Sequence, residues 1–187
     1  LKAGHTRYSH PKGLFELRQL IAKKLTSENG ITTKPENIIV TPGAKQASMI
    51  ALMAILEPHD DIINFTPCFI SYIPQFKIAE PTCKIHNIDL NRDNFSIDWD
   101  KVHNTVNSKT KVIVVNSPNN PTGNLLEREE ILQVARQWGK IVVVDEAYVE
   151  FSQEPSLVAE IDTVPNLILL RTLSKAFGRA GIRLGYG

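Results

Sequence analysis

The stretch that decides the fold is KVIVVNSPNNPTGNLLEREEILQVARQWGKIVVVDE, residues 111–146. It begins and ends with short apolar runs, 111–116 and 141–144, which are typical of buried strands. Residues 127–138 between them are expected to form a helix, with Glu129 and Glu130 near its positive end. A strand, a helix and a second strand in this order indicate a crossover between parallel strands. The stretch therefore predicts an α/β domain with a mostly parallel sheet.

The same alternation extends outward in both directions. Further helices are expected at 14–25, 44–56, 69–79 and 99–106, and Pro74 is expected to kink or stop the third of these. Further strands are expected at 38–40, 62–65, 82–88 and 167–170, with a turn at 41–43. Helices then cover both faces of the sheet, which makes a three-layer α/β/α fold. Nothing in the sequence marks a domain boundary within residues 1–187.

The composition narrows the class of function. The chain has 187 residues, with 21 Lys and Arg against 20 Asp and Glu. This balance argues against binding nucleic acid or an acidic membrane by bulk charge. The longest apolar run, 49–56, is far shorter than the roughly 20 residues of a membrane-spanning helix. The five histidines form no short metal-binding pattern, and the first residues, 1–5, lack the apolar segment of a signal peptide. Two cysteines are too few for a disulfide scaffold, so we expect a cytoplasmic protein. From the histidine pattern we expect no bound metal.

Polar clusters follow the apolar runs, at the carboxyl ends of strands where ligands bind in open α/β sheets. Asp145 follows four apolar residues, where a carboxylate is either costly or functional. A lone Asp at such a position is more often a helix cap or an ion-paired strand end, and Tyr148 by itself fits ordinary core packing equally well. Lys175 stands among arginines 171, 179 and 183, which indicates either a solvated basic loop or an anion site with a nucleophilic amine. The helix start at 43–45 offers backbone N–H groups that can reach a phosphate.

Taken together, these segments resemble the fold-type I aminotransferases that use pyridoxal 5'-phosphate (PLP). The matching motifs are YSHPKGLFELR at 8–18, TPGAKQA at 41–47, TPCFISY at 66–72, NSPNNPTG at 116–123, VVDEAYVEF at 143–151 and TLSKAFGRAGIRLGYG at 172–187. The last three look most like histidinol-phosphate aminotransferases, whereas TPGAKQA and PCFISY look more like the aspartate and aromatic aminotransferases. The resemblance covers nearly the whole chain.

The resemblance implies a catalytic role for three residues. Lys175 matches the lysine that forms a Schiff base with PLP and then shuttles a proton between the substrate and the cofactor. Asp145 matches the carboxylate that pairs with the pyridine nitrogen and keeps the ring protonated. Tyr148, together with Asn120, matches the groups that hydrogen-bond the phenolic oxygen of the cofactor.

The resemblance also implies a set of cofactor-binding residues. Arg183 matches the arginine that binds the phosphate with its fork of N–H donors. Hydroxyl donors from Thr172 and Ser174, and backbone donors of the helix start (Gly43, Ala44 and Lys45), would complete the phosphate site. Phe69 matches the ring that stacks on the pyridine, where the family often has Trp or Tyr. Tyr8 matches a tyrosine that reaches the phosphate in the neighbouring subunit, which implies a homodimer.

The predicted function is therefore amino transfer between an amino acid, or histidinol phosphate, and a 2-oxo acid. Another fold-type I PLP enzyme, such as a decarboxylase or a lyase, remains an alternative because it would share the same cofactor residues. A PLP-binding domain of a regulator is a third hypothesis, although no helix-turn-helix is visible in the sequence. We expect residues 1–187 to be the PLP-binding large domain of a longer chain, without its N-terminal arm and C-terminal small domain.

Overall fold

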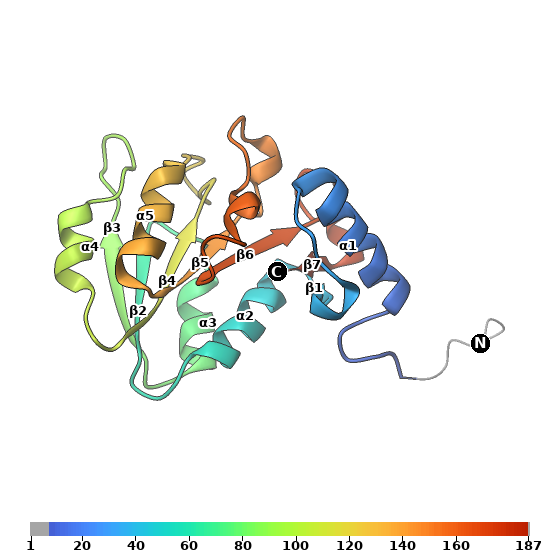
Figure 1. Cartoon of the computed structure of the whole chain (residues 1–187). Helices are drawn as coiled ribbons and strands as arrows, with labels where there is room; N and C mark the ends of the chain where they lie inside the picture. The colour runs from blue at the N-terminus through green and yellow to red at the C-terminus, as the bar shows by residue number, and fades with distance from the viewer. Residues whose placement is uncertain (1–7, 187) are drawn as a thin grey trace.

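The computed structural model describes residues 8–186, so the predictions that concern residues 1–5 and Gly187 lie outside it. A seven-stranded sheet forms its centre, in the order β1-β7-β6-β5-β4-β2-β3 (Figure 1). Strands β2 to β6 run parallel to one another, and β7 (Leu184–Tyr186) runs antiparallel to both β6 and β1 (Thr41–Pro42). The parallel strands are β2 (Asp61–Thr66), β3 (Lys84–Asp89), β4 (Thr110–Asn116), β5 (Ile141–Asp145) and β6 (Leu167–Thr172). The prediction of a mostly parallel sheet is confirmed.

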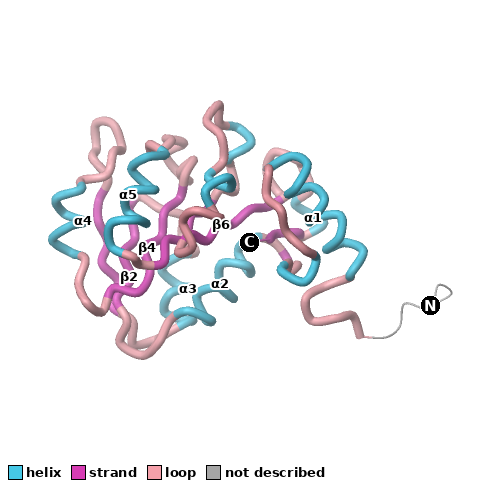
Figure 2. Tube along the Cα trace, viewed as in Figure 1, coloured by secondary structure: helices cyan, strands magenta, loops and turns pink. Residues whose placement is uncertain are grey.

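The two faces of the sheet are covered by different helices because side chains alternate along each strand. In β5, Val142 and Val144 join the core beneath α4 (Trp99–Thr105) and α5 (Arg128–Trp138), whereas Val143 joins the core beneath α2 (Ala44–Ile55) and α3 (Tyr72–Ala79). Strands β2 and β4 divide their apolar residues in the same way. Helix α1 (Phe15–Asn29) packs against β7 at the edge of the sheet in a third cluster. The result is a three-layer α/β/α domain (Figures 1 and 2).

All five predicted helices are present, with corrections to α1 and α3. Helix α1 continues to Asn29, beyond the predicted end at residue 25, because polar residues 26–28 extend it without adding to its apolar face. The prediction that Pro74 kinks or stops its helix is wrong. Pro74 is the third residue of α3, where a backbone N–H has no acceptor within the helix, so the proline costs no hydrogen bond. Helix α4 begins after Asp98, which accepts a hydrogen bond from Lys101 N as a helix cap should.

The edge of the sheet differs from the prediction. Residues 38–40 do not form the expected strand, since Ile38 ends a 3₁₀ turn (Pro35–Asn37) and packs beneath α1. The strand β1 lies instead at Thr41–Pro42, within the segment predicted as a turn, and its residues pair with Gly185 and Leu184. The strand β7 was not predicted. Short 3₁₀ helices at Val149–Phe151, Leu157–Glu160 and Ala180–Ile182 complete the described chain.

Two polar clusters are buried away from the ends of β4 and β5. At the start of β2, Asp61 accepts one hydrogen bond from the Asn107 side chain and forms a second with His86, each at 2.9 Å. Burial alone would raise the pKa of Asp61, but these hydrogen bonds hold it below the ordinary value of 3.8. Beneath β6, the guanidinium of Arg171 lies 2.6 Å from Glu150 and 3.6 Å from Glu146. All three side chains of this second cluster are at least mostly buried, so it is a structural ion-pair network.

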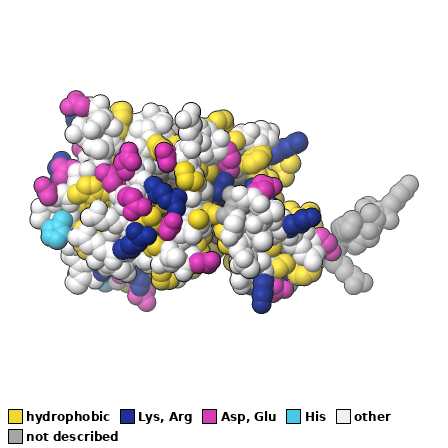
Figure 3. Space-filling model, turned by 45° about the horizontal axis from the view of Figure 1, so that its top comes forward, with side chains coloured by type: hydrophobic (Ala, Val, Ile, Leu, Met, Phe, Trp, Pro, Cys, Tyr) yellow, Lys and Arg dark blue, Asp and Glu magenta, His cyan; other side chains and the backbone are white. Residues whose placement is uncertain are grey.

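The face of the molecule in Figure 3 carries charges of both signs. On the face in Figure 3, basic and acidic side chains are interspersed and neither sign forms a continuous patch. Between residues 8 and 186, no helix has both the length and the apolar character that crossing a bilayer requires.

Candidate active site

The register of the sheet brings three strand ends to one level. Asn116 of β4 pairs with Asp145 of β5, and Asp145 in turn pairs with Leu170 of β6. The loops that follow these strands therefore start side by side. They carry Asn120, Tyr148 and Lys175, which come from three separate segments of the sequence.

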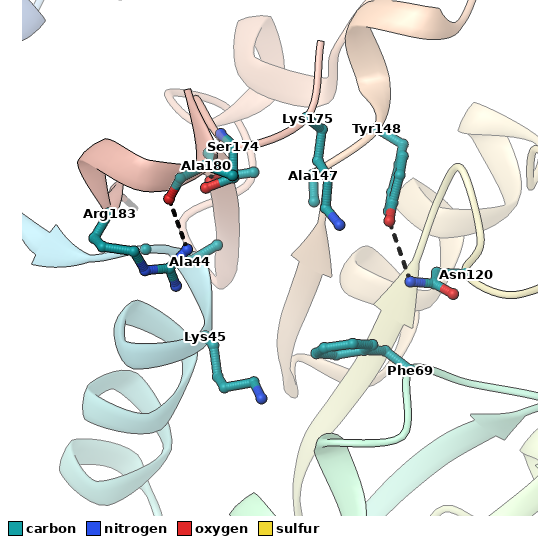
Figure 4. A pocket seen from close by; sticks show the side chains of 12 residues that line it. Ala44, Lys45, Phe69, Asn120, Ala147, Tyr148, Ser174, Lys175, Ala180 and Arg183 are labelled. Atoms are coloured by element: carbon teal, nitrogen blue, oxygen red, sulfur yellow. Dashed lines mark hydrogen bonds between the residues drawn. The ribbon is translucent and has the colours of Figure 1, made fainter. Parts of the chain in front are cut away.

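A cavity of about 210 Å³ lies between these loops and the start of α2 (Figure 4). Its lining contains ten of the twelve predicted site residues, the exceptions being Asp145 and Tyr8. Two small residues that the sequence did not single out also line it, and the complete lining is Gly43, Ala44, Lys45, Phe69, Asn120, Ala147, Tyr148, Thr172, Ser174, Lys175, Ala180 and Arg183. Ala147 and Ala180 belong to the quoted motifs, but a methyl side chain carries no chemical signal by which to find it.

Lys175 and Tyr148 face each other inside this cavity. The Lys175 amine lies 4.9 Å from the centre of the Tyr148 ring and points into the cavity (Figure 4). The Tyr148 hydroxyl accepts a hydrogen bond of 3.2 Å from the Asn120 side-chain amide. Asn120 is itself fixed, because its backbone N–H donates to the Asn116 side chain at 2.7 Å. A nucleophilic amine and two polar groups are thus held on one side of the cavity.

Asp145 lies just behind the lining. One of its oxygens, Oδ1, accepts from the backbone N–H of Ala147 at 3.0 Å, and the other, Oδ2, accepts from the Tyr72 hydroxyl at 2.6 Å. Burial raises the pKa of Asp145, while these two donors and the charge of Lys175 act in the opposite direction. The sequence did not single out Tyr72, although it closes the TPCFISY motif, because the surrounding segment was interpreted as an ordinary amphipathic helix.

The opposite end of the cavity has the properties of an anion site. The positive end of α2 opens onto it after Gly43, whose φ is +90° and whose added Cβ would lie 2.8 Å from the Arg183 guanidinium. Arg183 is held there by bonds to the carbonyls of Ala180 and Pro42, at 3.0 and 3.4 Å. Ser174 Oγ is buried without a hydrogen-bond partner among the described residues. A ligand with several acceptor oxygens would satisfy all of these donors.

The remaining predicted residues are Thr172 and Phe69, which line the cavity, and Tyr8, which does not. Thr172 lines the cavity, but its hydroxyl donates to the carbonyl of Leu184 at 3.2 Å, so it supports β7 rather than offering its proton to a ligand. Phe69 presents its ring to the cavity, with the Lys45 amine 5.5 Å from the ring centre. Tyr8 lies outside the cavity and is fully exposed.

Comparison with known proteins gives one consistent answer. The model of the family described as aminotransferase class I and II matches residues 2–187. A probable aspartate aminotransferase of Methanocaldococcus jannaschii is 36% identical over the whole chain, which covers 50% of that protein. A histidinol-phosphate aminotransferase of Ruminiclostridium cellulolyticum is 45% identical over 81% of the chain and 42% of its own length. The solved structure of an aspartate aminotransferase from Thermotoga maritima matches the whole chain with a TM-score of 0.87 at 32% identity, over 51% of its length. The chain thus spans about half the length of the relatives it matches.

Proposed function

Because the chain belongs to the class I and II aminotransferases, we propose that it is the cofactor-binding large domain of a longer transaminase. That enzyme would use PLP to move an amino group from an amino acid to a 2-oxo acid. The observation that carries the proposal is the single cavity that brings together the Lys175 amine, the Asn120–Tyr148 pair and the anion site at Arg183. The enclosed Asp145 carboxylate lies directly behind it.

The residues present fit PLP at both ends. The phosphate matches the anion site, because Ser174 Oγ lacks a hydrogen-bond partner within residues 8–186 and Gly43 leaves room where a Cβ would meet Arg183. The ring matches the other end, where Phe69 offers an aromatic face and Asp145 a carboxyl group. When bound, PLP supplies an aldehyde that takes up the amino group and a ring that accepts the electrons of the broken Cα–H bond.

Each residue of the chain then has a defined task. Lys175 would hold the cofactor through its amine and would serve as the group that carries a proton at the substrate Cα. Tyr148 and Asn120 would donate hydrogen bonds to the ring oxygen of the cofactor. Asp145 would accept from the ring nitrogen, and Arg183 with the start of α2 would hold the phosphate.

We further propose a cytoplasmic homodimer. The fully exposed side chain of Tyr8 supports the dimer, since the motif around it resembles one that reaches into a neighbouring subunit. The free thiols of Cys68 and Cys83 fit a reducing compartment. Aspartate, aromatic amino acids and histidinol phosphate are the candidate donors, because the names of the relatives include the first and the last of these.

The proposal is tested on the full-length protein with PLP. Borohydride should trap the cofactor on the peptide that contains Lys175, as mass spectrometry would reveal, and Lys175→Ala should abolish the trapped product. Lys109→Ala, at an exposed turn outside the cavity, is the matched control and should behave as wild type. An amino-donor panel of aspartate, aromatic amino acids and histidinol phosphate then identifies the substrate. Wild-type protein that takes up no PLP covalently, or that forms no 2-oxo acid from any donor, would refute the function.

A further inference from the structure

The hydrogen bond between Tyr72 and Asp145 links α3 to the end of β5. The two residues lie 73 positions apart in the sequence, and the distance between the Tyr72 hydroxyl and Asp145 Oδ2 is 2.6 Å. Tyr72 is only 3% exposed, so water does not compete for this bond. A hydroxyl that donates to a carboxylate at this distance is a strong, charge-assisted hydrogen bond.

The surroundings of Tyr72 fix the direction of its hydroxyl. Its ring meets Phe69 edge to face at 5.6 Å between centroids and stacks on Phe76 at 6.3 Å. Phe76 is fully buried in the core beneath the sheet, so the tyrosine ring cannot swing away from β5. The hydroxyl therefore reaches Asp145 from a rigid base.

The carboxylate of Asp145 is held at both oxygens. Ala147 N–H donates to Oδ1 and Tyr72 to Oδ2, one donor each. An ionised carboxylate accepts about four hydrogen bonds, so lone pairs remain for a further donor in front of the group. With its two other partners fixed, Asp145 can present these lone pairs in only a narrow range of directions.

The charge state of the pair is set by burial and by these donors. Burial raises the pKa of Asp145, whereas the Tyr72 hydroxyl, the Ala147 N–H and the charge of Lys175 lower it. Burial, and next to it the charge of Asp145, raises the pKa of Tyr72 well above its ordinary value, with smaller effects from Cys68 and Tyr148. Tyr72 thus keeps its proton and remains a donor at neutral pH.

We propose that Tyr72 is a positioning residue, whose hydroxyl keeps Asp145 ionised and aimed at the ring nitrogen of bound PLP. This inference rests on the proposed function, because it requires PLP in the cavity. It adds a residue that acts on the cofactor through another residue and does not line the cavity itself.

Tyr72→Phe tests the inference in the full-length protein loaded with PLP, because it removes the hydroxyl and keeps the ring. The ¹⁵N NMR signal of ring-labelled PLP should move toward that of the unprotonated nitrogen. The affinity for PLP and kcat should each fall about tenfold or more, as expected for the loss of a hydrogen bond to a charged group, with KM nearly unchanged. Losing a donor to the carboxylate raises the Asp145 pKa, so the acidic limb of the rate profile should move to higher pH.

The control is Tyr186→Phe, which removes the hydroxyl of another buried tyrosine outside this cavity and should leave the ¹⁵N signal unchanged. In an Asp145→Asn background, Tyr72→Phe should have little further effect on PLP affinity, because its route through the carboxylate is gone. Tyr72→3-fluorotyrosine preserves the packing but is a stronger donor, and it should move the acidic limb to lower pH.

The outcomes separate the two proposals. If wild-type protein takes up no PLP on Lys175, the proposed function itself fails. If wild type is loaded but Tyr72→Phe leaves the ¹⁵N signal and the acidic limb in place, the function stands and the role of Tyr72 is refuted. If the losses of PLP affinity caused by Tyr72→Phe and Asp145→Asn add up in the double variant, the role of Tyr72 is also refuted. Should Tyr72→Phe not fold, the direction of the shift in the fluorinated variant decides.

Discussion

Replacing Gly185 with alanine is expected to displace the start of α2 and to weaken PLP binding at the phosphate end. Gly185 lies in β7, where it pairs with Thr41 on one side and Thr172 on the other. A Cβ at this position would lie 2.1 Å from the backbone nitrogen of Ala44 and 2.2 Å from the carbonyl carbon of Gly43. Both neighbours are backbone atoms, so no side chain can rotate to make room.

The size of the effect follows from these distances. Ordinary contact begins at 3.4 Å, so β7 and the start of α2 must separate by about 1.3 Å. Inserting a methyl group into a closely packed site costs about 1–3 kcal/mol, and a clash with backbone atoms of both Gly43 and Ala44 points to the upper end. For a domain of this size, a loss of about 3 kcal/mol lowers Tm by roughly 6–12 °C. A shift of about 1 Å in groups that position a ligand also costs up to about a hundredfold in function.

The assays are thermal unfolding of the apo protein and titration with PLP, with inorganic phosphate as a second probe of the anion site. Gly181→Ala is the matched control, because its φ is ordinary and nothing lies within 4 Å of the added Cβ. It should leave Tm and PLP affinity nearly unchanged. Gly185→Ala with wild-type Tm and wild-type affinity for both ligands would refute the packing argument. A loss of stability with unchanged affinity would refute the link between β7 and the anion site.

Three further predictions concern other parts of the chain. Arg171→Leu should destabilise the protein by about 3–5 kcal/mol in urea unfolding, because it leaves the carboxylates of buried Glu146 and mostly buried Glu150 without their cation. Lys101→Ala, which breaks an exposed ion pair, should cost under about 1 kcal/mol, and equal losses in the two variants would contradict this. The folded-state pKa of Asp61 is lowered, so its contribution to stability is present above the ordinary value of 3.8 and is lost as the pH falls through the lower folded value. The urea midpoint of the wild type should therefore fall as the pH is lowered from about 5 to about 2, and it should fall less steeply in Asp61→Asn; an unchanged pH dependence would count against this. Residues 1–187 alone should show no efficient steady-state transamination, since closure of a second domain orients the substrate; measurable turnover by this chain would show that the domain suffices.

The central elements could be predicted from the sequence because they bury long apolar runs. Strands β4 and β5 are nearly continuous runs of Val and Ile, and α5 between them has a clear apolar face. The edge could not be predicted in the same way. Strands β1 and β7 have two and three residues, include Pro42 and Gly185, and exist only through their pairing with each other and with β6. Local sequence carries little information about such long-range pairing.

The site was predictable to the extent that it depends on strand ends. Asn120, Tyr148 and Lys175 each follow an apolar run, and the fold brings them to one cavity. Two features depended on contacts between distant segments and were not predictable. The Tyr72 hydroxyl reaches Asp145 from another layer of the fold, and the hydroxyl of Thr172 turns away to bond Leu184.

The pairing of β1 with β7 also sets the order in which the site can be assembled on the ribosome. Thr41 donates through its hydroxyl to the carbonyl of Gly185, a residue 144 positions later in the chain. Because synthesis proceeds from the N-terminus, α2 is made long before β7 and Arg183 leave the exit tunnel. During most of translation the anion site therefore has the start of α2 but lacks Arg183. Contacts between segments so far apart in the sequence are also slow to form. Capture of the cofactor becomes a late event in the biogenesis of this domain, which follows the closure of the edge of the sheet.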